Sequence, residues 1–179
     1  MGNKLFTISL KMLLVFTVAL ALFGIVYAGS GSNIDPVHKF AWSTNAGWIN
    51  FNATHGGTKV FPDHLEGYAW AENIGWIRLG THTGGGTHTY ANTSKTNYGV
   101  NKGPTGKLTG FAWSTNAGWI NFNPTHGGVT IDPASGDFNG YAWAENIGWI
   151  HFSKPGLYQV KALFEKLEKI TLPLVVKSK

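Results

Sequence analysis

The stretch that decides the fold is Phe40-Ala41-Trp42-Ser43-Thr44-Asn45-Ala46-Gly47-Trp48-Ile49-Asn50-Phe51, and it occurs in four copies. The other copies run from Tyr68 to Leu79, from Phe111 to Phe122 and from Tyr141 to Phe152. The first and third copies have nearly the same sequence, and so do the second and fourth, which indicates that a two-unit block has been duplicated. All eight tryptophans of the 179-residue chain fall inside the copies: Trp42, Trp48, Trp70, Trp76, Trp113, Trp119, Trp143 and Trp149.

Each copy predicts a β-hairpin. Aromatic and β-branched residues, which favour strands, stand on both sides of a short polar segment that contains Asn and Gly. Side chains alternate along strands, so Trp42 and Trp48 become cross-strand neighbours on one face, and Ile49 and Phe51 face the other. The predicted turn residues are Asn45, Gly47, Asn73, Gly75, Asn116, Gly118, Asn146 and Gly148.

Both faces of such a hairpin are apolar, which predicts that both are covered. Eight exposed indole rings would present ~1,200–2,000 Å² of aromatic surface. Soluble proteins rarely expose apolar patches larger than a few hundred Å². We therefore expect the eight tryptophans to form the structural core that joins successive repeats.

The fold class predicted from this pattern is all-β, with four tandem units of about three short antiparallel strands each. The units form a sandwich- or roll-like body, although the pattern does not distinguish sandwich, roll and barrel. The first block covers residues 29–79 and the second covers residues 98–153, with two units in each. Residues 80–97, rich in Gly, Thr and His, are predicted to be a linker loop between the blocks.

Residues 1–28 have the layout of a secretory signal peptide. Two lysines and no acidic residue accompany an apolar run, and Val26-Tyr27-Ala28 precedes the expected cleavage site. The alternative is an uncleaved membrane anchor, but the run is shorter than the ~20 apolar residues that span a bilayer. We expect a secreted or cell-surface protein that meets the membrane only through this segment before cleavage.

Residues 154–179 form a basic tail with six Lys and two Glu, whereas residues 29–153 hold six basic and seven acidic residues. Apolar residues at helical spacing from Leu157 to Ile170 predict a short amphipathic C-terminal helix. A competing interpretation makes Tyr158 to Lys161 the first strand of a truncated fifth unit. The near-neutral body carries no positive stripe, so nucleic acid is not an expected partner.

The phrase Gly-Tyr-Ala-Trp-x-Glu-Asn-Ile-Gly-Trp-Ile-x-Phe, preceded by Val-x-Ile-Asp-Pro-Ala-Ser-Gly, resembles repeats in secreted bacterial proteins, most of them uncharacterised. The similarity covers about Ile34 to Phe152. These repeats often stand beside cell-surface or adhesive modules. The resemblance implies an extracellular β-rich repeat protein, and it brings no catalytic residues.

The sequence points to no enzyme and no cofactor. Glu72 and Glu145 are acids at equivalent turns, with no second acid beside either for glycoside hydrolysis. The chain has no Cys, which excludes disulfides and Cys-type zinc sites. No metal site is predicted, and the weak candidates for imidazole ligands are His55, His82, His88 and His126.

We therefore expect a non-catalytic extracellular scaffold or adhesin-like module whose partner is a glycan or another surface protein. The alternative is a carbohydrate-binding module that uses a few exposed Trp and Tyr side chains with loop Asn residues. Exposure of the indole rings distinguishes the two, because a tryptophan core leaves few rings for a ligand.

Overall fold

The structure is a computed structural model that describes residues 31–164. These residues form 13 strands, all paired antiparallel, and contain no helix, which confirms the all-β class. The strands are β1 (Ile34–Ser43), β2 (Gly47–Asn50), β3 (Gly57–Val60), β4 (Leu65–Ala71), β5 (Gly75–Arg78), β6 (Val100–Lys102), β7 (Leu108–Ser114), β8 (Gly118–Asn121), β9 (Gly128–Ile131), β10 (Phe138–Ala144), β11 (Gly148–His151), β12 (Ser153–Lys154) and β13 (Tyr158–Ala162).

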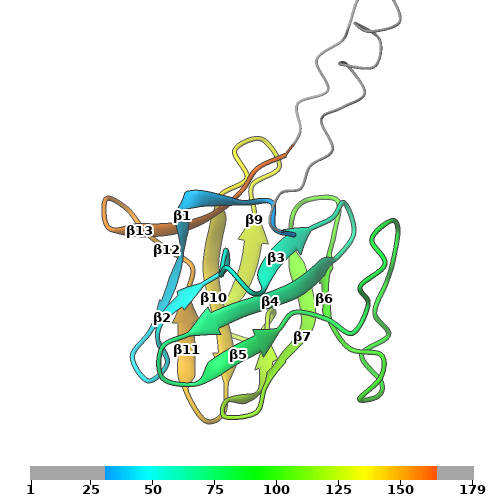
Figure 1. The fold of residues 1–179 in the computed structure, drawn as a ribbon, viewed down its shortest axis with the longest axis horizontal. Helices are drawn as coiled ribbons and strands as arrows, with labels where there is room; N and C mark the ends of the chain where they lie inside the picture. The colour runs from blue at the N-terminus through cyan, green and yellow to red at the C-terminus, as the bar shows by residue number, and fades with distance from the viewer. Residues whose placement is uncertain (1–30, 165–179) are drawn as a thin grey trace, which may run out of the picture.

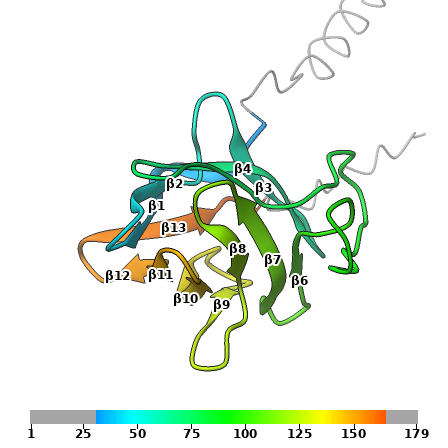
Figure 2. The same ribbon diagram turned by 90° about the horizontal axis from the view of Figure 1, so that it is seen from below.

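Eight of these strands close into a barrel (Figures 1 and 2). Their order is β11, β10, β8, β7, β5, β4, β2 and β1, and β1 then pairs with β11. The view from below in Figure 2 shows the strands arranged around a common centre. The structure thus replaces the predicted sandwich- or roll-like body with a closed barrel. Pairing of the first and last hairpins removes the unpaired edges that an open sheet would keep.

The four copies of the repeated phrase form four hairpins with the same register. In each hairpin the two tryptophans lie directly opposite each other, and a Gly pairs with Ser or Ala next to the turn. The cross-strand tryptophan neighbours predicted from the sequence are therefore confirmed. The hairpins are β1–β2, β4–β5, β7–β8 and β10–β11.

A further strand follows each hairpin after a loop. β3 pairs with β4, β6 with β7, β9 with β10, and β13 with β1. The longest of these loops, residues 79–99, contains the segment predicted as a linker, and it appears as the green loop beside β6 in Figure 1. Backbone hydrogen bonds of 2.9 Å from Thr81 N to Tyr98 O and from Val100 N to Leu79 O close its base. The chain on both sides of this loop contributes to one barrel.

Every second residue of the barrel strands points into the interior. In the first hairpin Ala41, Ile49 and Phe51 are buried, whereas Trp42 and Trp48 point outward. Aromatic rings from the first, third and fourth hairpins pack together inside, with centroids 5.4 to 6.3 Å apart. These rings belong to Phe51, Phe122, Phe138 and Phe152. The core is therefore built from Ala, Ile, Leu, Val and Phe.

The beginning of the C-terminal tail is a strand rather than a helix. Tyr158–Ala162 forms β13, so the predicted helix is wrong over these residues, and the alternative of a strand from Tyr158 to Lys161 is confirmed there. The physical reason is that burial follows the two-residue period of a strand, because Val160 and Ala162, two positions apart, both face the interior. Leu163 N donates a 2.7 Å hydrogen bond to Asn33 O, so the two ends of the described chain lie side by side.

Two predictions fall on parts of the chain beyond this description. The signal peptide at residues 1–28 lies outside the described residues, as does the tail from residue 165 onward. Within residues 31–164 no helix is long and apolar enough to cross a membrane.

Candidate functional site

The tryptophans lie on the outer face of the barrel, with exposed fractions from 37% to 42%. The predicted tryptophan core is therefore wrong. Alternation along each strand gives the inward positions to smaller side chains, which fill the narrow interior of an eight-stranded barrel and leave no room for indoles. This correction applies to Trp42, Trp48, Trp70, Trp76, Trp113, Trp119, Trp143 and Trp149.

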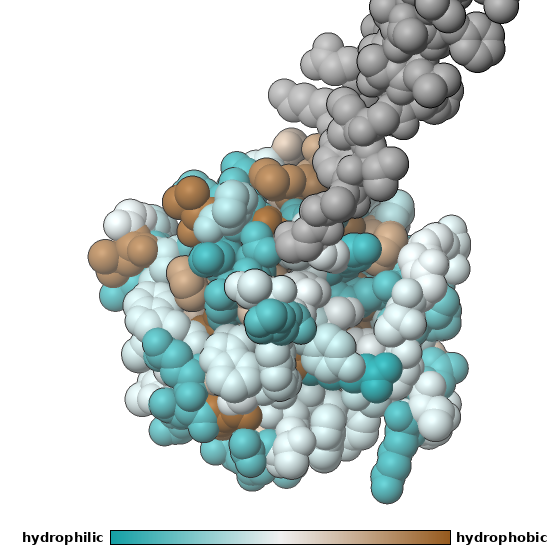
Figure 3. Space-filling view, in the orientation of Figure 1, coloured by the Kyte–Doolittle hydropathy of each residue, from teal (hydrophilic) through white to brown (hydrophobic). Residues whose placement is uncertain are grey.

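The outward rings form a belt around the barrel, here called the tryptophan belt. Within each hairpin the two indoles pack edge-to-face, with centroids 4.7 to 4.9 Å apart. Polar residues separate the pairs, so the aromatic surface is divided into smaller patches. The Cα partners between hairpins are Trp70 and Asn50, Trp113 and Arg78, Trp143 and Asn121, and Trp42 and His151. On the face shown in Figure 3, pale side chains of near-neutral hydropathy predominate and strongly hydrophobic residues form only small patches.

The predicted turn residues close the hairpins at one end of the barrel. The four turn glycines have φ between 71° and 76°, a region that favours Gly: Gly47, Gly75, Gly118 and Gly148. Three turn asparagines donate side-chain hydrogen bonds to carbonyl groups of a neighbouring turn, and Asn146 has the equivalent place in the fourth turn. The bonds run from Asn45 Nδ2 to Ile147 O (3.1 Å), from Asn73 Nδ2 to Asn45 O (3.1 Å) and from Asn116 Nδ2 to Ile74 O (3.0 Å).

A cavity of about 780 Å³, here called cleft one, opens beside the first hairpin. Its aromatic wall consists of Phe40, Trp48 and Tyr158, with the Trp48 ring 6.0 Å from Phe40 and 5.3 Å from Tyr158. Glu72 reaches in from the turn of the second hairpin, and its Oε2 accepts a 3.0 Å hydrogen bond from Trp48 N. Further polar lining comes from His38, Asn139, Ser153, Lys154 and Gln159.

A second cavity of about 520 Å³, here called cleft two, opens beside the third hairpin. Phe111, Trp119 and Tyr98 form its aromatic wall, with the Trp119 ring 6.2 Å from Phe111 and 4.9 Å from Tyr98. Glu145 enters from the turn of the fourth hairpin. The remaining lining residues are Asn92, Thr93, Ser94 and Lys95 from the loop between β5 and β6.

The two clefts lie at matching positions of the first and third copies of the repeated phrase. Trp48 and Trp119 are 71 residues apart, and the two glutamates are 73 residues apart. Tyr98 follows the second hairpin in the chain, and Tyr158 follows the fourth. Each tyrosine ring makes an angle of 83° with the tryptophan ring in its own cleft. Burial raises the pKa of both tyrosines, so each keeps a hydroxyl that can donate a hydrogen bond at neutral pH.

The second and fourth hairpins have a loop in place of a cleft. A Cβ at Gly56 would lie 2.6 Å from Cζ3 of Trp76, and one at Gly127 would lie 2.9 Å from Cζ3 of Trp149. The backbone therefore rests directly on these indoles, which gives the recurring Thr-His-Gly-Gly segments a packing role. The preceding residues, His55 and His126, are exposed on these loops, and neither joins the one metal-type cluster found among residues 31–164.

The carboxylates Glu72 and Glu145 lie in different clefts. Each is the only acidic residue that lines its cleft among the described residues. Glycoside hydrolysis of the usual kind requires two carboxyl groups on either side of one bond. The clefts therefore do not bring Glu72 and Glu145 together as such a pair.

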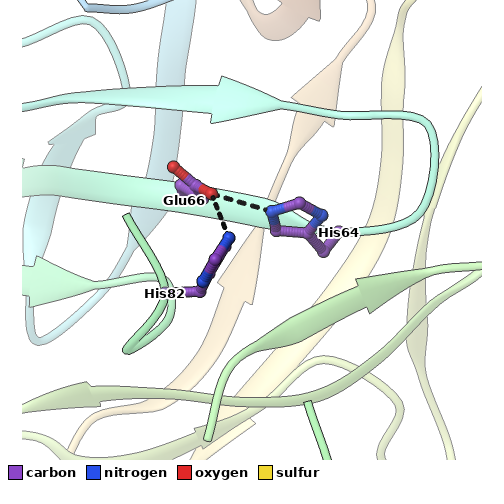
Figure 4. A group of neighbouring side chains, drawn as sticks. All are labelled: His64, Glu66 and His82. Carbon is purple, nitrogen blue, oxygen red and sulfur yellow. Dashed lines mark hydrogen bonds and ion pairs between the residues drawn. The ribbon is translucent and has the colours of Figure 1, made fainter. Parts of the chain in front are cut away.

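The structure brings His82 and His88 together with residues that the sequence reasoning missed. His82 Nε2 lies 3.6 Å from Glu66 Oε1, and His64 Nε2 lies 2.9 Å from the same oxygen (Figure 4). The His88 ring stacks on His82 with centroids 4.1 Å apart. Burial and the neighbouring histidines lower the pKa of His88. Burial opposes a low pKa at Asp63, but hydrogen bonds from His64 and His88 outweigh it and hold that pKa down.

One sequence signal could have indicated this cluster. His64 and Glu66 are two residues apart at the start of a strand, so they point to one face while Leu65 points to the other. The approach of His82 to Glu66 depends on the path of the loop between β5 and β6, and no sequence pattern predicted that path.

Comparison with known proteins identifies no relative: no family model matches the chain, and no curated protein or solved structure is significantly similar to it. The resemblance to secreted bacterial repeat proteins therefore stays a prediction.

Proposed function

We propose that this chain is a non-catalytic extracellular carbohydrate-binding module with two equivalent binding sites, cleft one and cleft two. The observation that carries the proposal is the recurrence of one wall, formed by Phe, Trp and Tyr with a Glu at its rim, in both clefts. The apolar C–H face of a sugar ring stacks on aromatic side chains, while its hydroxyls need polar partners. Clefts of about 300–1,000 Å³ with an apolar wall and a few polar groups are typical of small-ligand sites.

The exposed belt also changes the balance between the two functions expected from the sequence. The sequence favours the scaffold or adhesin role because a tryptophan core leaves few rings for a ligand. With every indole at least 37% exposed, that reason no longer applies. The proposed extracellular location depends on the signal segment at residues 1–28 and stays a prediction.

The test begins with a panel of soluble cello-, chito- and xylo-oligosaccharides, followed by calorimetry on the sugars that bind. The variants are Trp48→Ala, Trp119→Ala and the double variant, and the control is Trp143→Ala. Trp143 belongs to the belt and is 37% exposed, but it lines neither cleft. We expect two sites in the parent protein, one in each single cleft variant and none in the double variant.

Two results would count against the proposal. If the double variant binds as well as the parent, the sugar site lies elsewhere on the surface. If no carbohydrate in a broad screen binds and no indole is protected from iodide quenching, the scaffold or adhesin function becomes the better explanation.

A further inference from the structure

We propose that His64, Glu66 and His82 bind one zinc-class divalent metal ion, which fastens the loop of residues 79–99 to the outside of the barrel. His64 immediately precedes β4, Glu66 is the second residue of β4, and His82 comes from the loop (Figure 4). Nothing in the glycan-binding proposal depends on this site.

The spacing of the three donor atoms suits a small transition-metal ion. Glu66 Oε1 lies 2.9 Å from His64 Nε2 and 3.6 Å from His82 Nε2, and the donor atoms all lie within 4.8 Å of one another. Ligands at ~2.0–2.2 Å from a tetrahedral zinc ion stand ~3.3–3.5 Å apart. Side-chain movements of less than about 1 Å would therefore bring the three atoms to bonding distance.

The orientation of His64 is already that of a metal ligand. Its Nδ1 lies 2.6 Å from Asp63 Oδ1, a contact that suits the tautomer with the proton on Nδ1, and its Nε2 faces the Glu66 carboxylate. Phe61 stacks on the ring at 4.7 Å with an interplanar angle of 6°. The ring is 0% exposed, so packing holds it in this orientation.

His64 stands between the carboxylates of Asp63 and Glu66, with Nδ1 facing one and Nε2 facing the other. In the proposed site Nδ1 donates to Asp63, and the metal ion binds Nε2. The ion is then shared with His82, whose Nε2 faces the same Glu66 oxygen.

The donor set selects the class of ion. Two imidazoles and one carboxylate suit zinc and similar divalent transition metals, whereas calcium and magnesium prefer oxygen ligands. Three protein ligands leave a fourth position, and the 3.1 Å hydrogen bond that His82 Nε2 donates to Gly85 O would give way to the metal bond. Glu66 Oε1 also accepts a 2.8 Å hydrogen bond from Gly85 N, so the ion would sit against the loop backbone. The inferred role is structural.

The experiment uses the chelator-treated full chain, titrated with zinc chloride by calorimetry and with cobalt(II) chloride by visible absorption. Zinc should bind at one ion per chain, cobalt should give the intense visible bands of a four-coordinate site, and zinc should raise Tm in proportion to its free concentration. His82→Gln should weaken zinc binding at least tenfold, and Asp63→Asn should weaken it about 10- to 100-fold because it removes the partner that orients His64.

The matched control is His126→Gln, which removes an exposed histidine outside the cluster and should leave zinc affinity and stoichiometry unchanged. His64→Gln tests the buried ligand, and near-ultraviolet circular dichroism reports whether that variant folds. Since His82 is partly exposed, His82→Gln keeps the proposal testable even if the His64 variant unfolds. The proposal is overturned if no ion binds, if His82→Gln binds as tightly as the parent, or if the control loses the site.

Discussion

The strongest test of the barrel compares the same substitution at two adjacent residues of β8, Trp119→Gln and Ile120→Gln. These residues point to opposite faces, because Trp119 is 42% exposed and Ile120 is 1% exposed. Glutamine at the outer position keeps its amide in water. At the inner position the same amide is buried among apolar side chains.

The two costs follow from the covered surface. A fully buried aromatic removes up to ~250 Å² from water, so the covered part of Trp119 is about 140 Å², or ~3.5 kcal/mol at ~25 cal/mol per Å². Residual compactness of the unfolded chain removes ~10–40% of this, and the glutamine stem still covers part of the site, which leaves about 2 kcal/mol. Ile120→Gln loses ~1.5–3 kcal/mol of burial and adds ~1–3 kcal/mol for an unpaired amide, for a total of about 2.5–6 kcal/mol.

The assay is equilibrium unfolding in urea, followed by far-ultraviolet circular dichroism so that the missing indole does not affect the signal. Free energies come from linear extrapolation, and an unchanged m-value confirms that only stability has changed. Equal costs at the two positions, or a greater cost at Trp119, would show that the indole face is the buried one.

Three further predictions concern other parts of the barrel. Burial and the Lys154 ammonium lower the pKa of His151 in the folded protein, so as the pH falls the unfolded chain protonates this imidazole first. The contribution of neutral His151 to the free energy of unfolding is therefore complete above about pH 6.5, the ordinary pKa of histidine, and decreases below it. Urea midpoints at about pH 7 and pH 5 should therefore differ less in His151→Gln than in the parent. Asn116→Ala removes a hydrogen bond between turns and should cost ~0.5–1.5 kcal/mol by chemical unfolding; no measurable loss would mean that water replaces the bond. Gly106→Ala should lower Tm far more than Gly86→Ala, because both have positive φ but only at Gly106 would a Cβ overlap a carbonyl of β9; similar Tm values would contradict that close approach.

Local features of the chain were predictable because they depend on neighbours in sequence. The repeated phrase contains strand-forming residues, a Gly-containing turn and a two-residue period, and these are enough to predict the Trp42–Trp48 pair and the left-handed Gly47. The same period placed Ile49 and Phe51 together on the face opposite the indoles.

The candidate sites needed more than the repeat. Cleft one combines Trp48 with Tyr158 and Glu72, and these residues meet only because β13 pairs with β1 and the second hairpin lies beside the first. The histidine cluster likewise depends on the path of the loop that carries His82 to Glu66. No local periodicity specifies either approach.

The sequence by itself determined that the chain forms four β-hairpins with paired tryptophans, because turn chemistry and side-chain alternation act over a few residues. It did not determine which face of the hairpins becomes the inside. That choice was made by closure of β1 onto β11, since a barrel of eight strands has room for Ala, Ile and Phe but not for eight indoles. Closure turned the aromatic face outward, and the clefts exist because of it.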